Sequence, residues 1–119
     1  MAVEQYQSTW KTYQDAWANI PAVERKELLR QSVAEDCVFT SPQYEGSGLM
    51  QLVARVDEFQ KLYPGASFKT HKLIVHHDQL LAQWIMYDGS GAEFLPGSSY
   101  ARFNADGQLI QLVGFWELP

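Results

Sequence analysis

The sequence predicts an α+β protein in which three helices precede four consecutive antiparallel strands. Through the first half of the chain, apolar residues recur at spacings of three and four, which is the period of an amphipathic helix. From residue 67 onward, strand-like segments are separated by short turns, which is the pattern of β-hairpins. The 119 residues suffice for one hydrophobic core, so we expect a single domain, 1–119.

The first helix is predicted from one face that is almost entirely aromatic and that ends before Pro21. The apolar residues of this face are Val3, Tyr6, Trp10, Tyr13 and Trp17. Pro21 suits a first helical position, and a second helix follows to about Ser32. After the short strand "CVFTS", a third helical pattern runs until the "PG" at residues 64 and 65.

The second half of the chain contains four strand candidates. They read "SFKTHKLIVHH" at 67–77, "LLAQWIMYD" at 80–88, "FLPGSSYARF" at 94–103 and "QLIQLVGFWE" at 108–117. The second and fourth are apolar on both faces, although a sheet covered by helices on one side needs only one apolar face. We therefore expect the other face to meet a ligand, a partner subunit, or both.

Composition excludes several classes of protein. The net charge is −5 and the nine Lys and Arg residues are scattered, which argues against nucleic acid as a partner. The start "MAVEQYQSTW" lacks a leader pattern, and no apolar run approaches the roughly 18 residues of a membrane span. We expect a cytoplasmic protein without a membrane partner. The single Cys37 allows no internal disulfide and is expected to be a small core residue.

The element order, the phrase "AEDCVFTSP" before a glycine turn, and the ending "YARFNADGQLIQLVGFWE" together resemble the nuclear transport factor 2-like (NTF2-like) superfamily. Within it, the chain is most similar to the SnoaL-like polyketide cyclase and ketosteroid isomerase-like group. The resemblance implies a cone-shaped, cystatin-like fold, in which a curved antiparallel sheet wraps around three N-terminal helices. It also implies an apolar cavity that opens at one end, and a homodimer formed through the outer face of the sheet.

The resemblance also shows a departure at the acids of the isomerase branch. That branch has a general-base Asp directly before the proline that ends the first strand, and this position is Ser41. A second acid precedes Phe103 by four residues, and this position is Ser99. The Tyr of the oxyanion hole matches Tyr13. Because a serine hydroxyl is no proton acceptor without a strong base beside it, isomerisation by the family mechanism is not expected.

Three residues remain as catalytic candidates. His71 lies in a predicted strand and carries an imidazole, the commonest side chain in general-base roles, and Asp36 begins the first strand. Tyr13 would assist either of them as a hydrogen-bond donor. His76 and His77 are neighbours in a strand and should point to opposite faces, so we expect no metal site. No cofactor is expected, and an enzyme of this type would be a cofactor-independent isomerase or cyclase.

Aromatic and small residues are the candidates for lining the cavity. They are Tyr13, Trp17, Phe39, Ser41, Phe59, Tyr63, Trp84, Ser99, Ala101, Phe103, Leu112 and Trp116. Alternatives stay open at three places: Thr40 for Ser41, Ser98 for Ser99, and Tyr87 for Trp84. An apolar pocket with a few neutral hydroxyls is a common composition for sites that bind small molecules.

Three functions fit these observations. The first is a pocket protein that binds a hydrophobic, cyclic or polyketide-like compound. We favour it because Ser41 and Ser99 stand where the isomerase branch has its acids, and small hydroxyls there would keep the cavity open and remove its charge. The second is an enzyme that transfers protons through His71 or Asp36 with Tyr13, which a buried ionisable group in the cavity would favour. The third is a dimeric interaction module with a filled cavity, which a volume below roughly 300 Å³ would favour.

Overall fold

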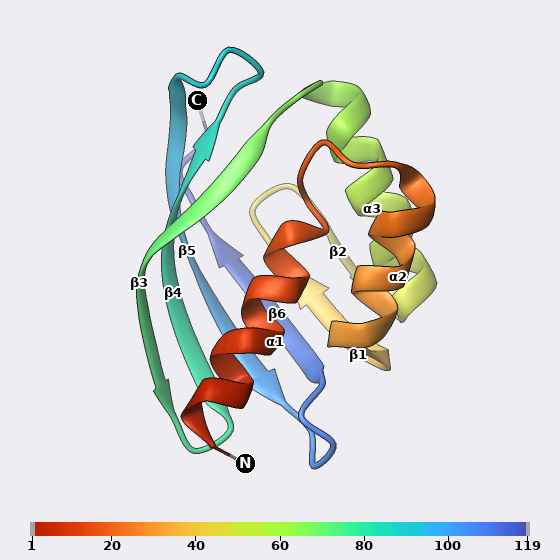
Figure 1. The fold of residues 1–119 in the computed structure, drawn as a ribbon, viewed down its shortest axis with the longest axis vertical. Coiled ribbons are helices and arrows are strands. Elements are labelled where there is room, and N and C mark those ends of the chain that lie inside the picture. The colour runs from red at the N-terminus through yellow and green to blue at the C-terminus, as the bar shows by residue number, and fades with distance from the viewer. Residues whose placement is uncertain (1, 119) are drawn as a thin grey trace.

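The computed structural model describes residues 2–118, and the helices and strands follow the predicted order (Figure 1). The elements are α1 (Val3–Asp15), α2 (Ala22–Ser32), β1 (Val33–Thr40), β2 (Glu45–Ser47), α3 (Leu49–Leu62), β3 (Ser67–His76), β4 (Gln79–Tyr87), β5 (Glu93–Phe103) and β6 (Leu109–Phe115). The predicted α+β class is confirmed. The short strand β2 was not predicted, because it lies where Gly46 and Gly48 indicated only a break.

The strands form one six-stranded sheet in the order β2-β1-β6-β5-β4-β3. The four C-terminal strands pair as the predicted antiparallel meander. Strand β1 joins this meander parallel to β6, and β2 closes the sheet antiparallel to β1. The sheet is therefore mixed. It is strongly curved, and the three helices lie on one side of it (Figure 1).

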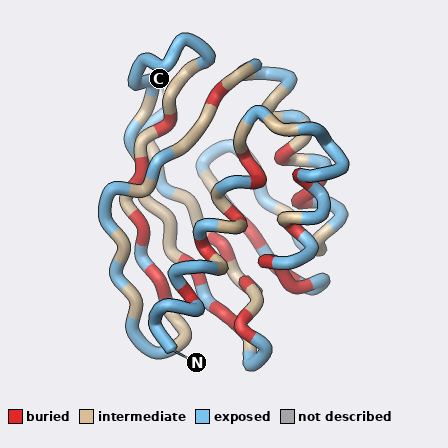
Figure 2. The backbone as a smooth tube through the Cα atoms, in the orientation of Figure 1, coloured by how far each residue is buried: buried red, intermediate tan, exposed pale blue. Residues whose placement is uncertain are grey.

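The helices cover the concave face of the sheet, and α1 crosses it (Figure 1). Burial alternates along β4, where Leu80, Ala82, Trp84 and Met86 are buried between less buried neighbours such as Leu81. Figure 2 shows that the buried positions lie mainly where the sheet and the helices face each other. The concave face of the sheet therefore forms one wall of the core, and the outer face carries Leu81.

A β-bulge in β3 changes which side chains face the core. Thr70 pairs with Trp84 and Lys72 pairs with Gln83, so His71 is an extra residue between two regular pairs. Regular alternation along the strand would place His71 and Leu73 on the same face. The bulge shifts the alternation, so Leu73 packs against the core while His71 stays exposed.

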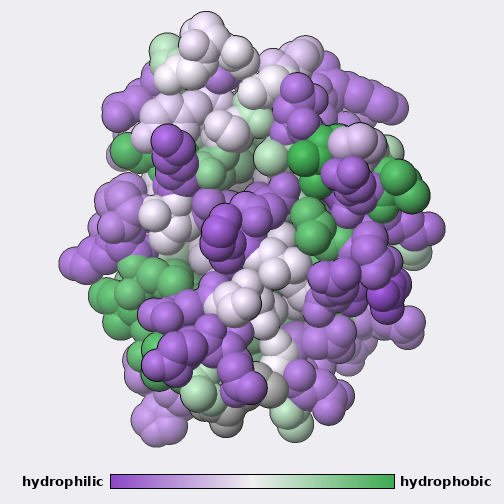
Figure 3. Space-filling model, viewed as in Figure 1, coloured by the Kyte–Doolittle hydropathy of each residue, from purple (hydrophilic) through white to green (hydrophobic). Residues whose placement is uncertain are grey.

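The surface on the helix-covered side is mostly hydrophilic, with apolar patches that include one over β3 (Figure 3). Strand β3 is an edge of the sheet, and its exposed residues include Lys69 and Lys72. Charged side chains on an edge strand hinder pairing with the strands of another chain. Among residues 2–118, no helix is both long enough and apolar enough to cross a lipid bilayer.

A buried arginine joins three of the helical segments. The guanidinium of Arg25 donates from Nη1 to Oδ1 of Asp57 at 2.7 Å, which links α2 to α3. Its Nε donates to the carbonyl oxygen of Ala16 at 3.1 Å, and Nη2 donates to that of Ile20 at 2.8 Å. The charge therefore satisfies carbonyl groups at and beyond the C-terminal end of α1, where a cation is favourable.

Replacement of Arg25 by Met should lower the free energy of unfolding by about 3 kcal/mol, because it leaves Asp57 and two carbonyl groups without their partner. Urea denaturation would measure the change. The matched control is Lys11→Met, which breaks an exposed pair with Asp15 and should change stability by less than about 0.5 kcal/mol. Equal effects of the two substitutions would contradict a structural role for Arg25.

Candidate functional site

An apolar cavity of about 140 Å³ lies between α1, α3 and the concave face of the sheet. Most of the predicted binding residues are in its wall: Tyr13, Trp17, Phe39, Phe59, Tyr63, Trp84, Ser99, Leu112 and Trp116. Thr40, Gln43 and the half-exposed Phe94 also line it, so the cavity opens to solvent near the β1–β2 connection and the start of β5. The ring of Tyr63 packs against Phe94 at this opening, with 5.7 Å between centroids.

Aromatic rings in contact with one another make up much of the wall. Phe68 contacts Phe59 on one side and Trp84 on the other, with ring centroids 5.3 and 5.2 Å apart. Trp84 in turn meets Trp116 edge-on at 5.8 Å. Tilted and edge-to-face arrangements are the favourable geometries for aromatic pairs. Each ring is therefore positioned by the next, and the wall of the cavity is a packed structure.

Two glycines determine how the tryptophans of the sheet lie. A Cβ atom added to Gly97, which pairs with Trp84 across β4 and β5, would overlap the indole ring of Trp84. A Cβ at Gly114 would lie 2.6 Å from the ring of Trp116. Both rings therefore lie directly on glycine backbone. This arrangement explains the glycine within strand β5 as a site of close ring packing.

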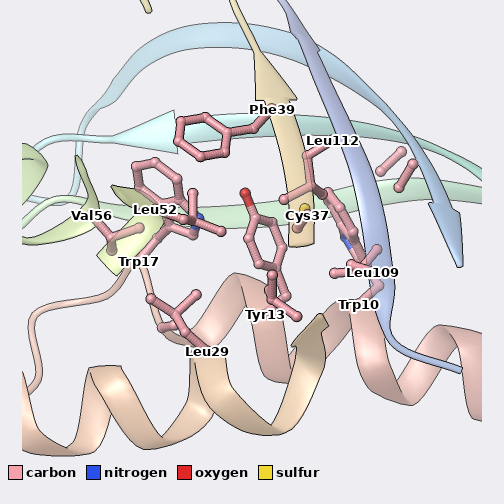
Figure 4. Packing of buried hydrophobic residues seen from close by; sticks show 14 of the residues in the cluster. Trp10, Tyr13, Trp17, Leu29, Cys37, Phe39, Leu52, Val56, Leu109 and Leu112 are labelled. Carbon is pink, nitrogen blue, oxygen red and sulfur yellow. The ribbon is translucent and has the colours of Figure 1, made fainter. Parts of the chain in front are cut away.

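Tyr13 places a hydroxyl group inside the aromatic wall. Figure 4 shows its side chain extending from α1 between Trp10 and Trp17, with the oxygen directed toward the strands that carry Phe39 and Leu112. Burial raises the pKa of Tyr13 well above its ordinary value of 10.0, the charge of Tyr44 adds to this, and a hydrogen bond from Trp17 opposes it. The phenol therefore remains protonated at neutral pH and can act as a hydrogen-bond donor.

Other polar groups around the cavity are paired with one another. The indole Nε1 of Trp84 donates to Oγ of Ser99 at 2.9 Å, and that of Trp10 donates to Oγ1 of Thr70 at 3.0 Å. The Thr70 hydroxyl donates to Gln14, whose amide nitrogen donates to the carbonyl oxygen of Phe68. These bonds satisfy groups that would be costly to bury alone.

The Tyr13 hydroxyl differs from these groups. Within residues 2–118, every fully enclosed polar side-chain atom has a hydrogen-bond partner. Tyr13 lines the cavity, and among residues 2–118 no protein acceptor is found for its phenolic proton. The phenolic proton is therefore the group that the Tyr13 side chain can offer to a ligand.

Within residues 2–118, no Asp, Glu, Lys, Arg or His is among the residues that line the cavity. The structure places Asp36 and His71 on the exposed surface, away from Tyr13. The three residues considered for proton transfer are therefore not brought together. Their assignment as catalytic residues has no support from the geometry of the cavity.

Ser41 is also outside the wall of the cavity. Its Oγ accepts hydrogen bonds from the backbone N–H groups of Gln43 at 3.3 Å and Tyr44 at 3.2 Å. The hydroxyl therefore caps the turn that follows β1, which is a common role for serine in a loop. Of the two alternatives at the end of this strand, it is Thr40 that lines the cavity.

Ala101 and Phe103 belong to the core but do not line the cavity. Both are almost completely buried, and Phe103 packs against Tyr6 of α1 with ring centroids 4.5 Å apart. At the other open alternatives, Ser99 and Trp84 line the cavity, and Ser98 and Tyr87 do not. The part of the core around Phe103 is thus filled by side chains.

Sequence reasoning missed several residues of the wall. Trp10 lies on the aromatic face predicted for α1 and could have been included. Phe68 and Met86 lie on β3 and β4, where the sequence left the inner face open. Tyr44 could not have been included, because it follows β1 in a connection without regular periodicity.

The described residues offer no cluster of three or more His, Cys, Asp or Glu side chains suited to a metal ion. His76 and His77 do not point to opposite faces as expected. His77 lies in the turn after β3 with φ of 52°, and the two Nδ1 atoms are 3.1 Å apart. The pair lies on the exposed surface, away from the cavity.

The fold and the cavity define a class, namely small α+β proteins with a cone-shaped, NTF2-like architecture. A model of the SnoaL-like domain family matches residues 10–112, which is most of the chain. The protein belongs to the SnoaL-like domain family. A comparison with curated proteins gave no match.

Solved structures support the same fold. A candidate isomerase of the SnoaL-like family from Agrobacterium tumefaciens is 22% identical, with a TM-score of 0.89 over 98% of this chain and 100% of that one. A candidate SnoaL-like polyketide cyclase from Jannaschia is 16% identical, with a TM-score of 0.79 over 96% and 86%. A candidate ketosteroid isomerase from Kribbella flavida is 19% identical, with a TM-score of 0.75 over 98% and 80%. At these identities, the likeness shows the fold alone.

Stability should fall in alkaline solution, starting at about pH 9. Burial, with a contribution from the charge of Asp36, raises the pKa of the Cys37 thiol from 9.0 to about 12. Above pH 9 the unfolded chain releases this proton and the folded chain keeps it, so the stabilisation is lost as the pH rises toward 12. The pKa values of Tyr13 and Tyr44 are also raised, and their contributions begin near pH 10.

Urea denaturation between pH 7 and pH 11 would measure this decline. In Cys37→Ala, the free energy of unfolding should remain constant to about pH 10, whatever its value at pH 7. If the free energy of unfolding begins to fall at the same pH in the variant and in the unchanged protein, the thiol does not contribute to the alkaline loss of stability.

Proposed function

We propose that this protein binds a small hydrophobic, cyclic compound in the cavity between α1, α3 and the sheet. The observation that supports this most directly is the composition of the wall, which is aromatic and uncharged and includes the protonated phenol of Tyr13. The structural neighbours described as candidates for a polyketide cyclase and a ketosteroid isomerase support a cyclic ligand.

Catalysis by proton transfer is the weaker alternative. An isomerase or cyclase needs a group that accepts a proton from the bound substrate, within hydrogen-bond reach of it. Neither Asp36 nor His71 is in the wall, and the Tyr13 phenol is held in its protonated form. Tyr13 could polarise a carbonyl group of a ligand, but the cavity supplies no base to complete an isomerisation.

The volume of about 140 Å³ favours the alternative of an interaction module with a filled cavity. It is below the roughly 300 Å³ typical of small-molecule sites, so aromatic side chains fill part of the cone. Even so, an apolar cavity of about 150 Å³ is known to accept a benzene-sized molecule. We retain the pocket as the proposal because the remaining space reaches solvent and contains the Tyr13 hydroxyl.

A homodimer through the outer face of the sheet is part of the proposal. Ile74, Leu81, Tyr100 and Val113 are paired in one row across β3, β4, β5 and β6. Ile74 and Leu81 are 46% and 41% exposed in the single chain. Apolar residues on the solvent side of a sheet are favourable when a second subunit covers them.

The buried, unpaired Cys37 supports the cytoplasmic location expected from the sequence.

Replacement of Tyr13 by Phe should weaken the binding of a neutral aromatic ketone about tenfold, because one hydrogen bond contributes about 1 kcal/mol. Calorimetric titration with acetophenone would measure the affinity. The control is Tyr100→Phe, which removes a hydroxyl bonded to Gln79 outside the cavity and should leave the affinity unchanged. An equal loss in both variants, or none in either, would remove Tyr13 from the binding site.

Replacement of Leu81 by Glu should convert a dimer to a monomer, because it places a charge in the centre of the apolar row. Light scattering coupled to size-exclusion chromatography would report the mass. The matched control is Val23→Glu on α2, where the side chain is 77% exposed and away from the sheet. A monomeric unchanged protein would refute the proposed interface.

A further inference from the structure

We infer that the cavity selects a neutral ligand with one ring and an oxygen acceptor, and that Trp116, with Trp84, sets this size limit. The inference rests on the proposed function and specifies the ligand class. It follows from the volume of the cavity, the absence of charge in its wall, and the way in which the two tryptophans are seated on glycine.

The volume sets the number of rings. About 140 Å³ is close to the size of an apolar cavity that holds a single benzene molecule. A second fused ring would have to displace side chains of the wall or extend through the opening near Phe94. The four rings of a steroid would have to displace much more of the wall, or extend much further through the opening. A single ring is therefore the largest group that fits without rearrangement.

The wall determines the charge of the ligand. A carboxylate or ammonium group would leave water for a site that offers it no charged partner, which is strongly unfavourable. A neutral oxygen is different, because the Tyr13 phenol is protonated and its proton is available. A carbonyl, ether or hydroxyl oxygen can accept this hydrogen bond, and the rest of the ligand then lies among aromatic rings.

Trp84 and Trp116 are fixed to different degrees. Trp84 is only 7% exposed, its ring lies on Gly97, and its indole N–H is bonded to Ser99. Burial, ring packing and this hydrogen bond together fix its position. Trp116 follows the last residue of β6 and is only partly buried. Its ring rests on Gly114 and contacts the rings of Trp84 and Tyr44. Removal of Trp116 should therefore enlarge the cavity with the least damage to the fold.

The experiment compares three probes by calorimetric titration. Acetophenone has one ring and a ketone, 2-acetonaphthone has two rings and the same ketone, and benzoate has one ring and a charge. The unchanged protein should bind acetophenone at least tenfold more tightly than either of the others. In Trp116→Ala, the affinity for 2-acetonaphthone should increase at least tenfold relative to the affinity for acetophenone.

Two further variants separate a change in cavity size from a general loss of structure. Phe115→Ala removes an aromatic ring that is 59% exposed and outside the cavity, and it should keep the preference of the unchanged protein. Gly97→Ala should push the Trp84 ring into the cavity and weaken the binding of acetophenone at least tenfold. Circular dichroism would establish that each variant is folded before its titration is interpreted.

Each outcome bears on a separate claim. Equal binding of the one-ring and two-ring ketones by the unchanged protein would overturn the size limit and leave the proposed function standing. Benzoate binding as tight as that of acetophenone would overturn the selection for neutral ligands. An unaltered preference in folded Trp116→Ala would remove this residue as the determinant. If neither ketone binds and native mass spectrometry finds no retained compound, the proposed function fails together with the inference.

Discussion

The ion pair between Arg25 and Asp57 is the constraint on which the arrangement of the helices depends. One guanidinium group holds α2 to α3 and also binds the carbonyl groups of Ala16 and Ile20 beyond the body of α1. The segment that follows α1 is thereby fixed relative to α3, and this segment carries Trp17, which packs edge-on against Phe59. The helical side of the cavity is thus positioned by a charge that lies outside it, and the cavity itself can remain uncharged.

Much of the fold follows from periodicity, and the exceptions have local causes. The aromatic face of α1 predicted which residues of this helix face the core, whereas β4 is apolar on both faces and its sequence left the inner face open. The bulge at His71 shifts the alternation along β3, because one unpaired residue breaks a period of two while the sequence around it remains strand-like. The parallel pairing of β1 with β6 joins residues far apart in the chain, and no local pattern encodes such a contact.

The candidate site was predictable to the extent that its residues lie on regular elements. Tyr13, Trp84 and Ser99 were found from their faces or from the family resemblance, and all three line the cavity. Ser41 was placed there from the same resemblance, but its hydroxyl is used by the turn after β1. A serine can bond to a ligand or to the backbone nearby, and only the geometry of the turn distinguishes these uses. The loop residue Tyr44 could not be found by periodicity.

The distribution of tryptophan gives the protein an internal reporter. All four tryptophans of the chain, Trp10, Trp17, Trp84 and Trp116, line the cavity. The whole indole fluorescence of the molecule therefore originates from the wall that a ligand would touch, with no tryptophan elsewhere to add a constant background. A compound that enters the cavity displaces solvent from these rings or packs against them, and either event changes their emission. Libraries of compounds can thus be screened against the unlabelled protein, and the natural ligand can be sought in cell extracts by the same optical change.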